Sequence, residues 1–166
     1  MKVYTENTGG MPRYAHDGDA GMDIRASEDI TLKPGETKAV GTNLKIAVPK
    51  GFMIDVRPRS GLSLNTPIRV ANAPGTIDSG FRGEVKVILY NSSFPFAIHN
   101  GEIKNLDDVY TLDEKGNKHG TYQIKRGDRI AQLVFMKYEE PEIHVVDDIS
   151  TINGDRGGGF GHSGLK

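Results

Sequence analysis

The segment EVKVILYN, residues 84–91, decides the fold class of this chain. Its apolar residues Val85, Val87 and Leu89 stand at every second position. Successive side chains of a β-strand point to opposite faces of a sheet, so this spacing predicts a strand with one buried face. The segments LKIAVP (residues 44–49) and FMIDVRP (residues 52–58) repeat the spacing. RIAQLVFMKY (residues 129–138) is apolar on both faces and predicts a central strand that is covered on both sides.

Turn-forming residues separate these segments along the whole chain. The 21 glycines and 8 prolines are spread out, which is typical of many short strands. ITLKPGETKAV (residues 30–40) predicts two short strands about a Pro-Gly turn, and only one short helix is expected, near residues 60–64. The 166 residues predict a single domain over residues 1–166 with an all-β sandwich or barrel fold.

The composition narrows the functional classes. With 21 basic and 22 acidic side chains, the chain has no charge excess that would favour nucleic acid or an anionic membrane surface. It contains no cysteine, which excludes disulfides and thiolate sites. No stretch approaches the roughly 20 apolar residues of a membrane span, and MKVYTENTGGMPRYAHDGDAG at the N-terminus lacks the apolar core of a signal peptide. We therefore expect a soluble, cytoplasmic protein.

Residues 92–120 break the strand rhythm. The segment SSFPFAIHNGEIKNLDDVYTLDEKGNKHG is polar and turn-rich, and it separates two strong strands. It predicts a long surface excursion with its own hairpin around Lys115, Gly116 and Asn117. Such excursions are decoration in some proteins and partner-binding surfaces in others, and both interpretations stay open here.

Five polar or glycine-rich stretches lie at predicted strand ends: DAGMDIRA (19–26), RPRSGLSL (57–64), NAPGTIDSGFRGEV (72–85), RGDRIAQLV (126–134) and DRGGGFGHSG (155–164). Taken singly, their charged residues could be ordinary surface ion pairs. Taken together, they suit an anionic, metal-bound substrate. Arginine offers a planar fork to phosphate oxygens, and a lone carboxylate such as Asp23 suits Mg²⁺ that rides on substrate phosphates.

Several other chemistries lack their motifs. No GxxxxGK[ST] is present, so the chain is not a P-loop protein. The five histidines show no HExxH spacing, so zinc is not expected. No GxSxG elbow appears, which disfavours a serine triad.

The order and wording of the five stretches resemble the five motifs of the trimeric dUTP diphosphatase family. The resemblance spans residues 19–164. It implies a β jelly-roll whose homotrimer builds three shared active sites. It also implies cleavage of dUTP to dUMP and pyrophosphate with Mg²⁺, which keeps uracil out of DNA and supplies dUMP for dTTP synthesis.

The third motif implies the site for the base, the sugar and the attacking water. Asp78 matches the carboxylate that activates the water and holds the sugar 3′-hydroxyl. Asn72 matches the amide that reads uracil, and the backbone of Thr76 and Ile77 would line the same pocket. Phe81 replaces the family's usual Tyr beneath the deoxyribose, where a ring excludes a 2′-hydroxyl.

The first, second and fourth motifs imply the phosphate side. Arg59, Ser60 and Gly61 match the phosphate-binding turn, where backbone amides at the start of a short helix can point at a phosphate. Gln132 matches a phosphate-side contact. Asp23 matches the acidic residue near Mg²⁺, acting through coordinated water.

The fifth motif implies a flap, residues 153–166, that closes on the substrate. Phe160 would stack on the uracil, and Arg156 and Ser163 would reach the terminal phosphates. The spacing from Arg156 to Phe160 is four positions, one fewer than is usual in the family. The excursion at residues 92–120 also resembles the insert of family members from phages of Gram-positive bacteria, some of which bind bacterial repressor proteins.

Two alternatives remain at this stage. A dCTP deaminase shares the fold and much of the third motif, but it needs a catalytic Glu ten positions after the motif's Asp, and this chain has Ile88 there. A non-catalytic β-sandwich binding module would need neither a metal nor a carboxylate placed like Asp78. Pyrophosphate release from dUTP distinguishes both from the diphosphatase.

Overall fold

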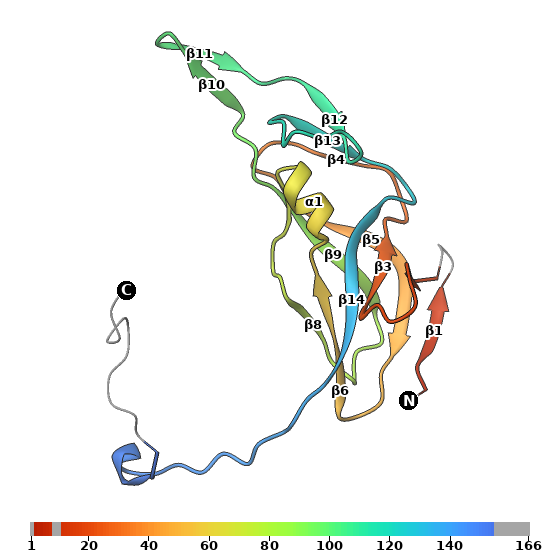
Figure 1. Cartoon of the computed structure of the whole chain (residues 1–166), viewed down its shortest axis with the longest axis vertical. Helices are drawn as coiled ribbons and strands as arrows, with labels where there is room; N and C mark the ends of the chain where they lie inside the picture. The colour runs from red at the N-terminus through yellow and green to blue at the C-terminus, as the bar shows by residue number, and fades with distance from the viewer. Residues whose placement is uncertain (1, 8–10, 155–166) are drawn as a thin grey trace.

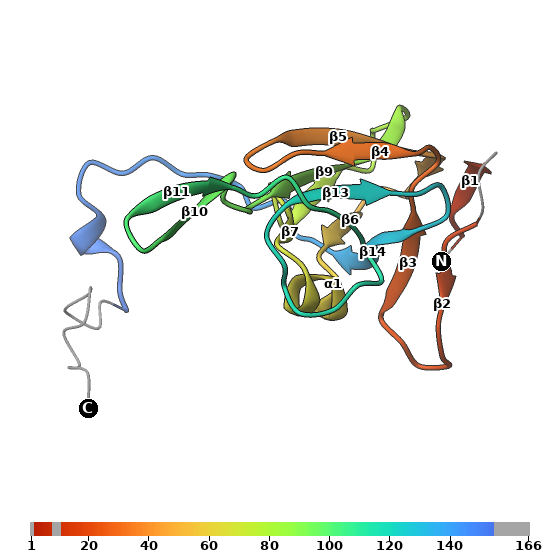
Figure 2. The ribbon, with the colours of Figure 1, turned by 90° about the horizontal axis from the view of Figure 1, so that it is seen from above.

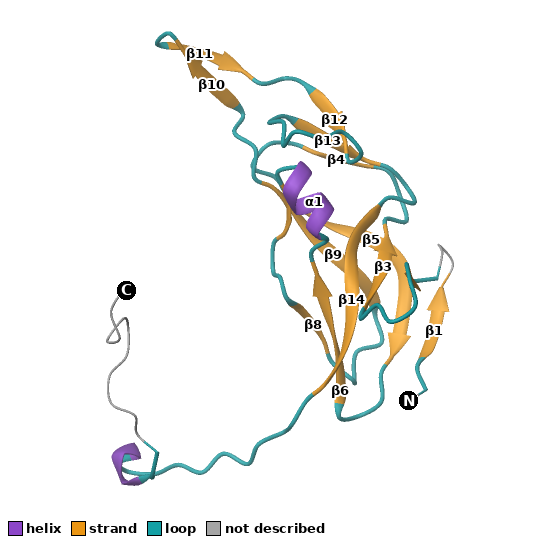
Figure 3. Cartoon of the chain, in the orientation of Figure 1, coloured by secondary structure: helices purple, strands orange, loops and turns teal. Residues whose placement is uncertain are grey.

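The computed structural model describes residues 2–7 and 11–154, and strands dominate it (Figure 3). The first seven strands are β1 (Tyr4–Asn7), β2 (Arg13–Tyr14), β3 (Gly21–Arg25), β4 (Ile30–Leu32), β5 (Thr37–Ala47), β6 (Phe52–Arg57) and β7 (Ile68–Val70). The others are β8 (Gly75–Ile77), β9 (Glu84–Asn91), β10 (Phe96–His99), β11 (Glu102–Asn105), β12 (Val109–Thr111), β13 (Thr121–Ile124) and β14 (Arg129–Lys137). The helices are α1 (Ser60–Asn65), where one short helix was predicted, and the 3₁₀ helix η1 (Ile149–Thr151).

Two sheets pack face to face and enclose the core (Figure 1). One has the strand order β1-β5-β9-β7 and the other the order β2-β3-β14-β6-β8. The prediction from the opening segment is confirmed, because Val85, Val87 and Leu89 of β9 are at most 2% exposed. Burial of these alternate side chains against the facing sheet is what stabilises the sandwich.

Strand β14 is central, as its sequence predicted, because it pairs with β3 on one side and with β6 on the other. The prediction that both of its faces are covered is wrong. Leu133 points into the core and is fully buried, whereas Gln132 and Val134 on the other face stay partly exposed. That outer face lines a pocket, which is described below.

Strand β5 runs for 11 residues, so the expected separate strands at residues 37–40 and 44–49 are joined. Its register against β9 shifts between Val40 and Leu44, which marks a β-bulge. The carboxylate of Glu84 accepts the backbone amides of Thr42 and Asn43 at 3.0 and 2.9 Å. The bulge therefore keeps its amides hydrogen-bonded, and the chain continues as one strand.

The excursion at residues 92–120 contains a hairpin, but the predicted position around residues 115–117 is wrong. Strands β10 and β11 pair across Asn100 and Gly101, whose φ angles are 51° and 82°. Asn-Gly is favoured at such a two-residue turn because both central residues need positive φ. At the predicted position, the amide of Asn117 instead donates to the carbonyl of Asn65 at 2.8 Å. The β10–β11 hairpin projects beyond the sandwich when the molecule is seen from above (Figure 2).

The side chain of buried Asn91 forms hydrogen bonds at both the start and the end of this excursion. Its side-chain amide donates to the carbonyls of Leu32 and Gly120 at 3.0 and 2.9 Å, and its side-chain oxygen accepts the amide of Ser93 at 3.0 Å. Strand β12 then pairs in parallel with β13, and β13 pairs antiparallel with β4. The segments that precede and follow the hairpin are therefore hydrogen-bonded to the rest of the fold.

After β14 the chain leaves the sandwich as an extended arm that leads to η1 (Figure 1). Apolar side chains on this arm face solvent, since Ile143, Val145 and Ile149 are 85%, 95% and 77% exposed. Over the part of the chain that the structure describes, no helix is both long enough and apolar enough to span a membrane.

Candidate functional site

The first, second and fourth motifs meet on the outer face of the five-stranded sheet. They line a pocket of about 520 Å³, which we call the strand pocket. Its lining residues are Ala15, Asp19, Ala20, Gly21, Asp23, Arg57, Pro58, Arg59, Ser60, Gly61, Arg129, Gln132 and Val134. Asp23, Arg59, Ser60, Gly61 and Gln132 were all expected here from the sequence.

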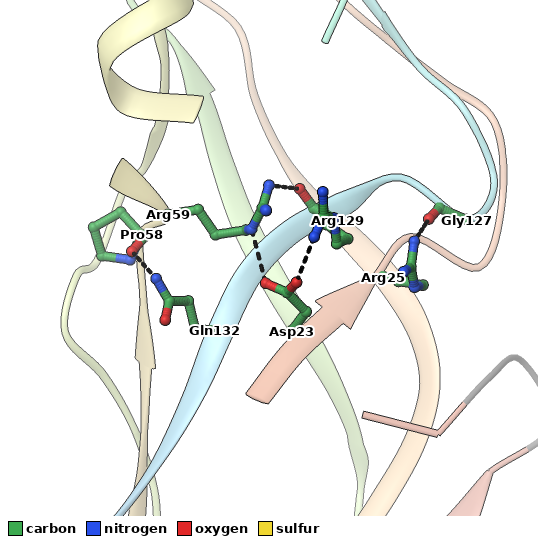
Figure 4. A network of polar contacts seen from close by, with 7 residues as sticks. All are labelled: Asp23, Arg25, Pro58, Arg59, Gly127, Arg129 and Gln132. Carbon is green, nitrogen blue, oxygen red and sulfur yellow. Dashed lines mark hydrogen bonds and ion pairs between the residues drawn. The ribbon is translucent and has the colours of Figure 1, made fainter. Parts of the chain in front are cut away.

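Asp23 holds two arginines at this pocket. Arg59 Nε lies 2.8 Å from one carboxylate oxygen of Asp23, and Arg129 Nη1 lies 3.0 Å from the other (Figure 4). Arg59 Nη1 also donates to the carbonyl of Arg129 at 3.3 Å. The side chains of Asp23 and Arg59 are 18% and 23% exposed, so this pair is shielded from water more than a surface ion pair would be, whereas the Arg129 side chain is 46% exposed. The guanidinium groups are thus positioned before any anion binds.

Gln132 lies directly across from Asp23 on β3 and from Arg57 on β6. Its side-chain nitrogen donates to the carbonyl of Pro58 at 3.3 Å. A Cβ atom added to Gly21 would collide with the side-chain oxygen of Gln132. Glycine in the first motif therefore makes room for the glutamine of the fourth.

The second motif forms the start of α1. This helix has only six residues and no side-chain hydrogen bond at its N-cap, Arg59. Its dipole is therefore smaller than that of a long helix. A Cβ atom added to Gly61 would meet no described atom within 4 Å, so the backbone beside Ser60 is open on the pocket side.

The third motif lines a second, separate pocket of about 170 Å³, which we call the hairpin pocket. It is formed at β8, the following turn and the start of β9. Its lining residues are Val56, Asn72, Gly75, Thr76, Ile77, Asp78, Phe81, Glu84, Val85 and Lys86. The expected residues Asn72, Thr76, Ile77, Asp78 and Phe81 are all among them.

Asp78 and Phe81 lie in the turn between β8 and β9. The side chain of Asp78 is exposed, while its carbonyl accepts the amide of Phe81 at 3.1 Å. The Phe81 side chain is 41% exposed, and its ring lies so close to Gly83 that an added Cβ there would come within 2.8 Å of Cζ. The turn thus presents a carboxylate and an aromatic ring to the same pocket.

The strand pocket and the hairpin pocket share no lining residue. The sequence-predicted residues of the described chain are therefore divided between two places on one molecule. The expected flap residues Arg156, Phe160 and Ser163 lie outside the described residues.

Two residues of these pockets were missed from the sequence. Arg129 lies inside the fourth motif, RGDRIAQLV, three positions before Gln132. A cationic side chain so close to an expected phosphate contact was the signal from which it could have been found. Glu84, the second-to-last residue of the third motif, lines the hairpin pocket and accepts the backbone amides of the β5 bulge. The backbone amide of Asn43 is the main cause that lowers the pKa of Glu84, against the opposing effect of burial.

The carboxylates do not form a metal cage. Within the described ranges, no group of three or more His, Cys, Asp or Glu side chains could hold a metal ion. Both oxygens of Asp23 already accept guanidinium donors. This donor set fits Mg²⁺ that is carried by phosphates and keeps its waters, which is the usual way proteins bind this ion.

Ile88, at the position where a dCTP deaminase needs its catalytic Glu, lies on β9. Ile88 pairs with Ala39 of β5 and is partly buried. Its side chain cannot transfer a proton, so the deaminase alternative has no acid or base at that position.

Comparison with known proteins agrees with this arrangement. A family model described as dUTPase matches residues 7–103 and 116–164. A deoxyuridine 5′-triphosphate nucleotidohydrolase of Anaeromyxobacter sp. (strain Fw109-5) is 42% identical over 156 residues, which are 93% of this chain and 87% of the relative. The enzyme of that name from Fusobacterium nucleatum subsp. nucleatum is 40% identical over an alignment of 167 positions, which covers 99% of this chain and 96% of the relative.

Solved phage structures share the fold. The Staphylococcus bacteriophage 80alpha dUTPase with dUpNHpp aligns with a TM-score of 0.81 and 27% identity, covering 99% of each chain. A mutant dUTPase from phage phi11 of S. aureus, described with a structural Mg(II) ion, aligns with a TM-score of 0.72 and 28% identity, covering 90% of this chain and 99% of that chain.

The family match skips residues 104–115, so this part of the excursion departs from the common core of the family, whereas residues 92–103 and 116–120 are matched. The five motifs all fall within the matched residues. The two-sheet sandwich is the expected β jelly-roll. The match over most of its length and the relatives at about 40% identity show that this chain belongs to the dUTPase family.

Proposed function

We propose that this protein hydrolyses dUTP to dUMP and pyrophosphate by attack of water on the α-phosphorus. The observation that carries the proposal is the chemistry of the two pockets. One holds two guanidinium groups fixed by Asp23, and the other presents an exposed carboxylate beside an aromatic ring and an amide. Such an enzyme keeps uracil out of DNA and supplies dUMP for dTTP synthesis.

The deoxyuridine end of the substrate suits the hairpin pocket. The Asn72 amide offers a donor and an acceptor to the edge of uracil, and the β8 backbone at Thr76 and Ile77 lines the same space. The Phe81 ring would limit the room at the sugar 2′ position. Asp78 is exposed, so a water molecule can reach its carboxylate and lose a proton to it during attack.

The triphosphate suits the strand pocket. Arg59 uses its Nε and one Nη in the Asp23 network and keeps further N–H groups for phosphate oxygens. The backbone at Ser60 and Gly61 and the Gln132 amide add neutral donors. Mg²⁺ on the phosphates would lower the charge of the leaving pyrophosphate, and Asp23 would contact the ion through coordinated water.

The two pockets share no lining residue, and the family resemblance implies sites that are shared between subunits. We therefore propose a homotrimer with shared sites. The extended arm supports this assembly, since its apolar residues Ile143 and Val145 face solvent in a single chain. The flap residues Arg156, Phe160 and Ser163 would then cover the phosphates and the uracil. A cytoplasmic location, that of the host if the protein is phage-encoded, belongs to the same proposal.

A nucleotide panel with pyrophosphate detection tests this function. The full chain is incubated with dUTP, UTP, dCTP and dTTP, each with and without Mg²⁺. We expect pyrophosphate from dUTP alone, at a rate that depends on Mg²⁺. Ammonia release from dCTP would instead identify a deaminase, and no release from any nucleotide would favour a binding module.

A second function rests on the β10–β11 hairpin. Ile98 and Ile103 lie directly opposite each other on this hairpin, and each is 70% exposed. Phe96 on the same strand is 44% exposed. Exposed apolar side chains grouped in this way mark protein-binding surfaces. We therefore propose that the excursion at residues 92–120 also binds a protein partner, of the repressor type that the phage resemblance implies.

A short deletion tests this second function. The amide of Leu106 donates to the carbonyl of Pro95 at 2.9 Å, so two glycines can join these residues in place of 96–105. The deletion is limited to residues 96–105 because a deletion of residues 103–118 would also remove β12 and the contact of Asn117 with Asn65. We expect the hairpin deletion to keep dUTP turnover within about twofold, because surface changes away from a site have small effects. Capture of a candidate repressor should be lost, and capture that survives would show that the hairpin is not the binding surface.

A further inference from the structure

A third pocket borders the strand pocket on the same face of the sheet. It has a volume of about 360 Å³, and we call it the arginine pocket. Its lining residues are Met11, Arg13, Tyr14, Ala15, Asp23, Arg25 and Arg129. Three of these residues, Ala15, Asp23 and Arg129, also line the strand pocket. The two pockets are therefore neighbours, with Asp23 and Arg129 in the wall between them.

The arginine pocket carries an excess of positive charge. Three arginines line it, against the single carboxylate of Asp23. That carboxylate already forms ion pairs with Arg59 and Arg129. In the described part of the chain, Arg13 and Arg25 have no carboxylate within ion-pair distance. The charge at this pocket is therefore not neutralised by described residues.

The strand register places two of these like charges directly opposite each other. Arg25 on β3 pairs with Arg129 on β14, and Arg13 on β2 pairs with Asp23. Like charges at directly opposed positions destabilise a sheet. The two side chains turn apart, Arg25 toward the carbonyl of Gly127 at 2.6 Å and Arg129 toward Asp23 (Figure 4). A polyanion between them would remove this repulsion.

We propose that the arginine pocket is a second anion site, which binds inorganic pyrophosphate while the nucleotide occupies the strand pocket. This inference rests on the proposed function for the source of the pyrophosphate. Arginine forks bind phosphate oxygens with two parallel hydrogen bonds, and Arg13 and Arg25 offer two such forks that no described carboxylate pairs. Because Arg129 lines both pockets, it can hold the leaving pyrophosphate on either side of Asp23. The pocket is then the route by which this product departs.

The test is a calorimetric titration of pyrophosphate into the full chain saturated with dUpNHpp and Mg²⁺. The wild type should bind pyrophosphate although its nucleotide site is filled. Arg13→Gln and Arg25→Gln should each weaken this binding about tenfold, the scale of one charge-assisted hydrogen bond. Arg13→Gln is the more informative variant, because Arg25 also bonds to Gly127 within the fold. Lys104→Gln removes the same charge from exposed β11 and should bind like the wild type.

Three results would overturn the proposal. Pyrophosphate could fail to bind once dUpNHpp is present, or both arginine variants could bind it as the wild type does. Alternatively, dTTP could bind the saturated protein at least about tenfold more tightly than pyrophosphate, which would make a second nucleotide the occupant. If the wild type neither turns over dUTP nor binds dUpNHpp, the proposed function fails. The same titration without nucleotide then still decides whether Arg13 and Arg25 bind pyrophosphate.

Discussion

The strand pocket and the hairpin pocket differ in how their charged groups are held. In the strand pocket, the part-buried carboxylate of Asp23 on β3 forms ion pairs with Arg59, the N-cap of α1, and with Arg129 on β14. In the hairpin pocket, Asp78 is exposed on a turn beside the edge strand β8, and it forms no ion pair with the described residues. The charged groups of the strand pocket are therefore fixed by ion pairs within one chain, whereas the carboxylate of the hairpin pocket is not.

The largest effect is expected where the hairpin pocket loses its proposed general base, Asp78. Asp78→Asn should lower kcat about 10²–10⁴-fold, because the amide cannot take a proton from water. Binding of dUpNHpp should change little, since an amide of the same shape remains. Steady-state kinetics and a binding titration together check this. Turnover close to that of the wild type would show that another group is the base, and the contrast between the pockets would then fail.

An intermediate effect is expected in the strand pocket. Arg59→Lys keeps the charge but loses the planar fork, so kcat/KM should fall about 10–10²-fold. Most of this loss should appear in KM, because the proposed contacts of the guanidinium with the phosphates are made both before and during the reaction. The matched control is Arg126→Lys, at an exposed arginine outside both pockets. An unchanged KM for Arg59→Lys would mean that the network serves stability and not substrate binding.

The smallest effect on turnover is expected at Glu84, which links the hairpin pocket to the bulge of β5. Glu84→Ala leaves the amides of Thr42 and Asn43 without their acceptor, which should cost about 1–3 kcal/mol of unfolding free energy. Glu84→Gln keeps an oxygen in that place and should lose less. Urea unfolding of both variants gives the comparison, and kcat should change only a few-fold. Equal stability of Glu84→Ala and the wild type would show that these two hydrogen bonds do not stabilise the fold.

The same residue gives a pH dependence. The folded-state pKa of Glu84 is lowered from its ordinary value of 4.5, chiefly by the amide of Asn43. The ionised carboxylate therefore stabilises the fold above pH 4.5, and this contribution is lost as the pH falls through the lower folded pKa. The stability advantage of the wild type over Glu84→Gln should narrow in that acid range. A difference that stays constant from about pH 7 downward would contradict this assignment.

Much of the fold could be predicted from alternation along the chain. Val85, Val87 and Leu89 are buried as their spacing predicted, and the short helix begins at Ser60. The hairpin of the excursion was misplaced because the excursion contains two turn-forming segments, Asn100-Gly101 and Gly116-Asn117. Only Asn100-Gly101 lies between two segments that pair as strands. The joined strand β5 was missed because its bulge depends on Glu84, which is distant in sequence.

The sequence by itself determined the family, through five motifs in order, and the kinds of side chain that the site contains. Only the tertiary structure decided how these side chains are grouped. Asp23 and Arg129 are 106 positions apart, and the register of β3 against β14 brings them together. That register depends on which side chains of both strands fit the common core, because a slip of one residue would turn every side chain to the other face. The division into two pockets, and the opposition of Arg25 to Arg129, follow from the same packing.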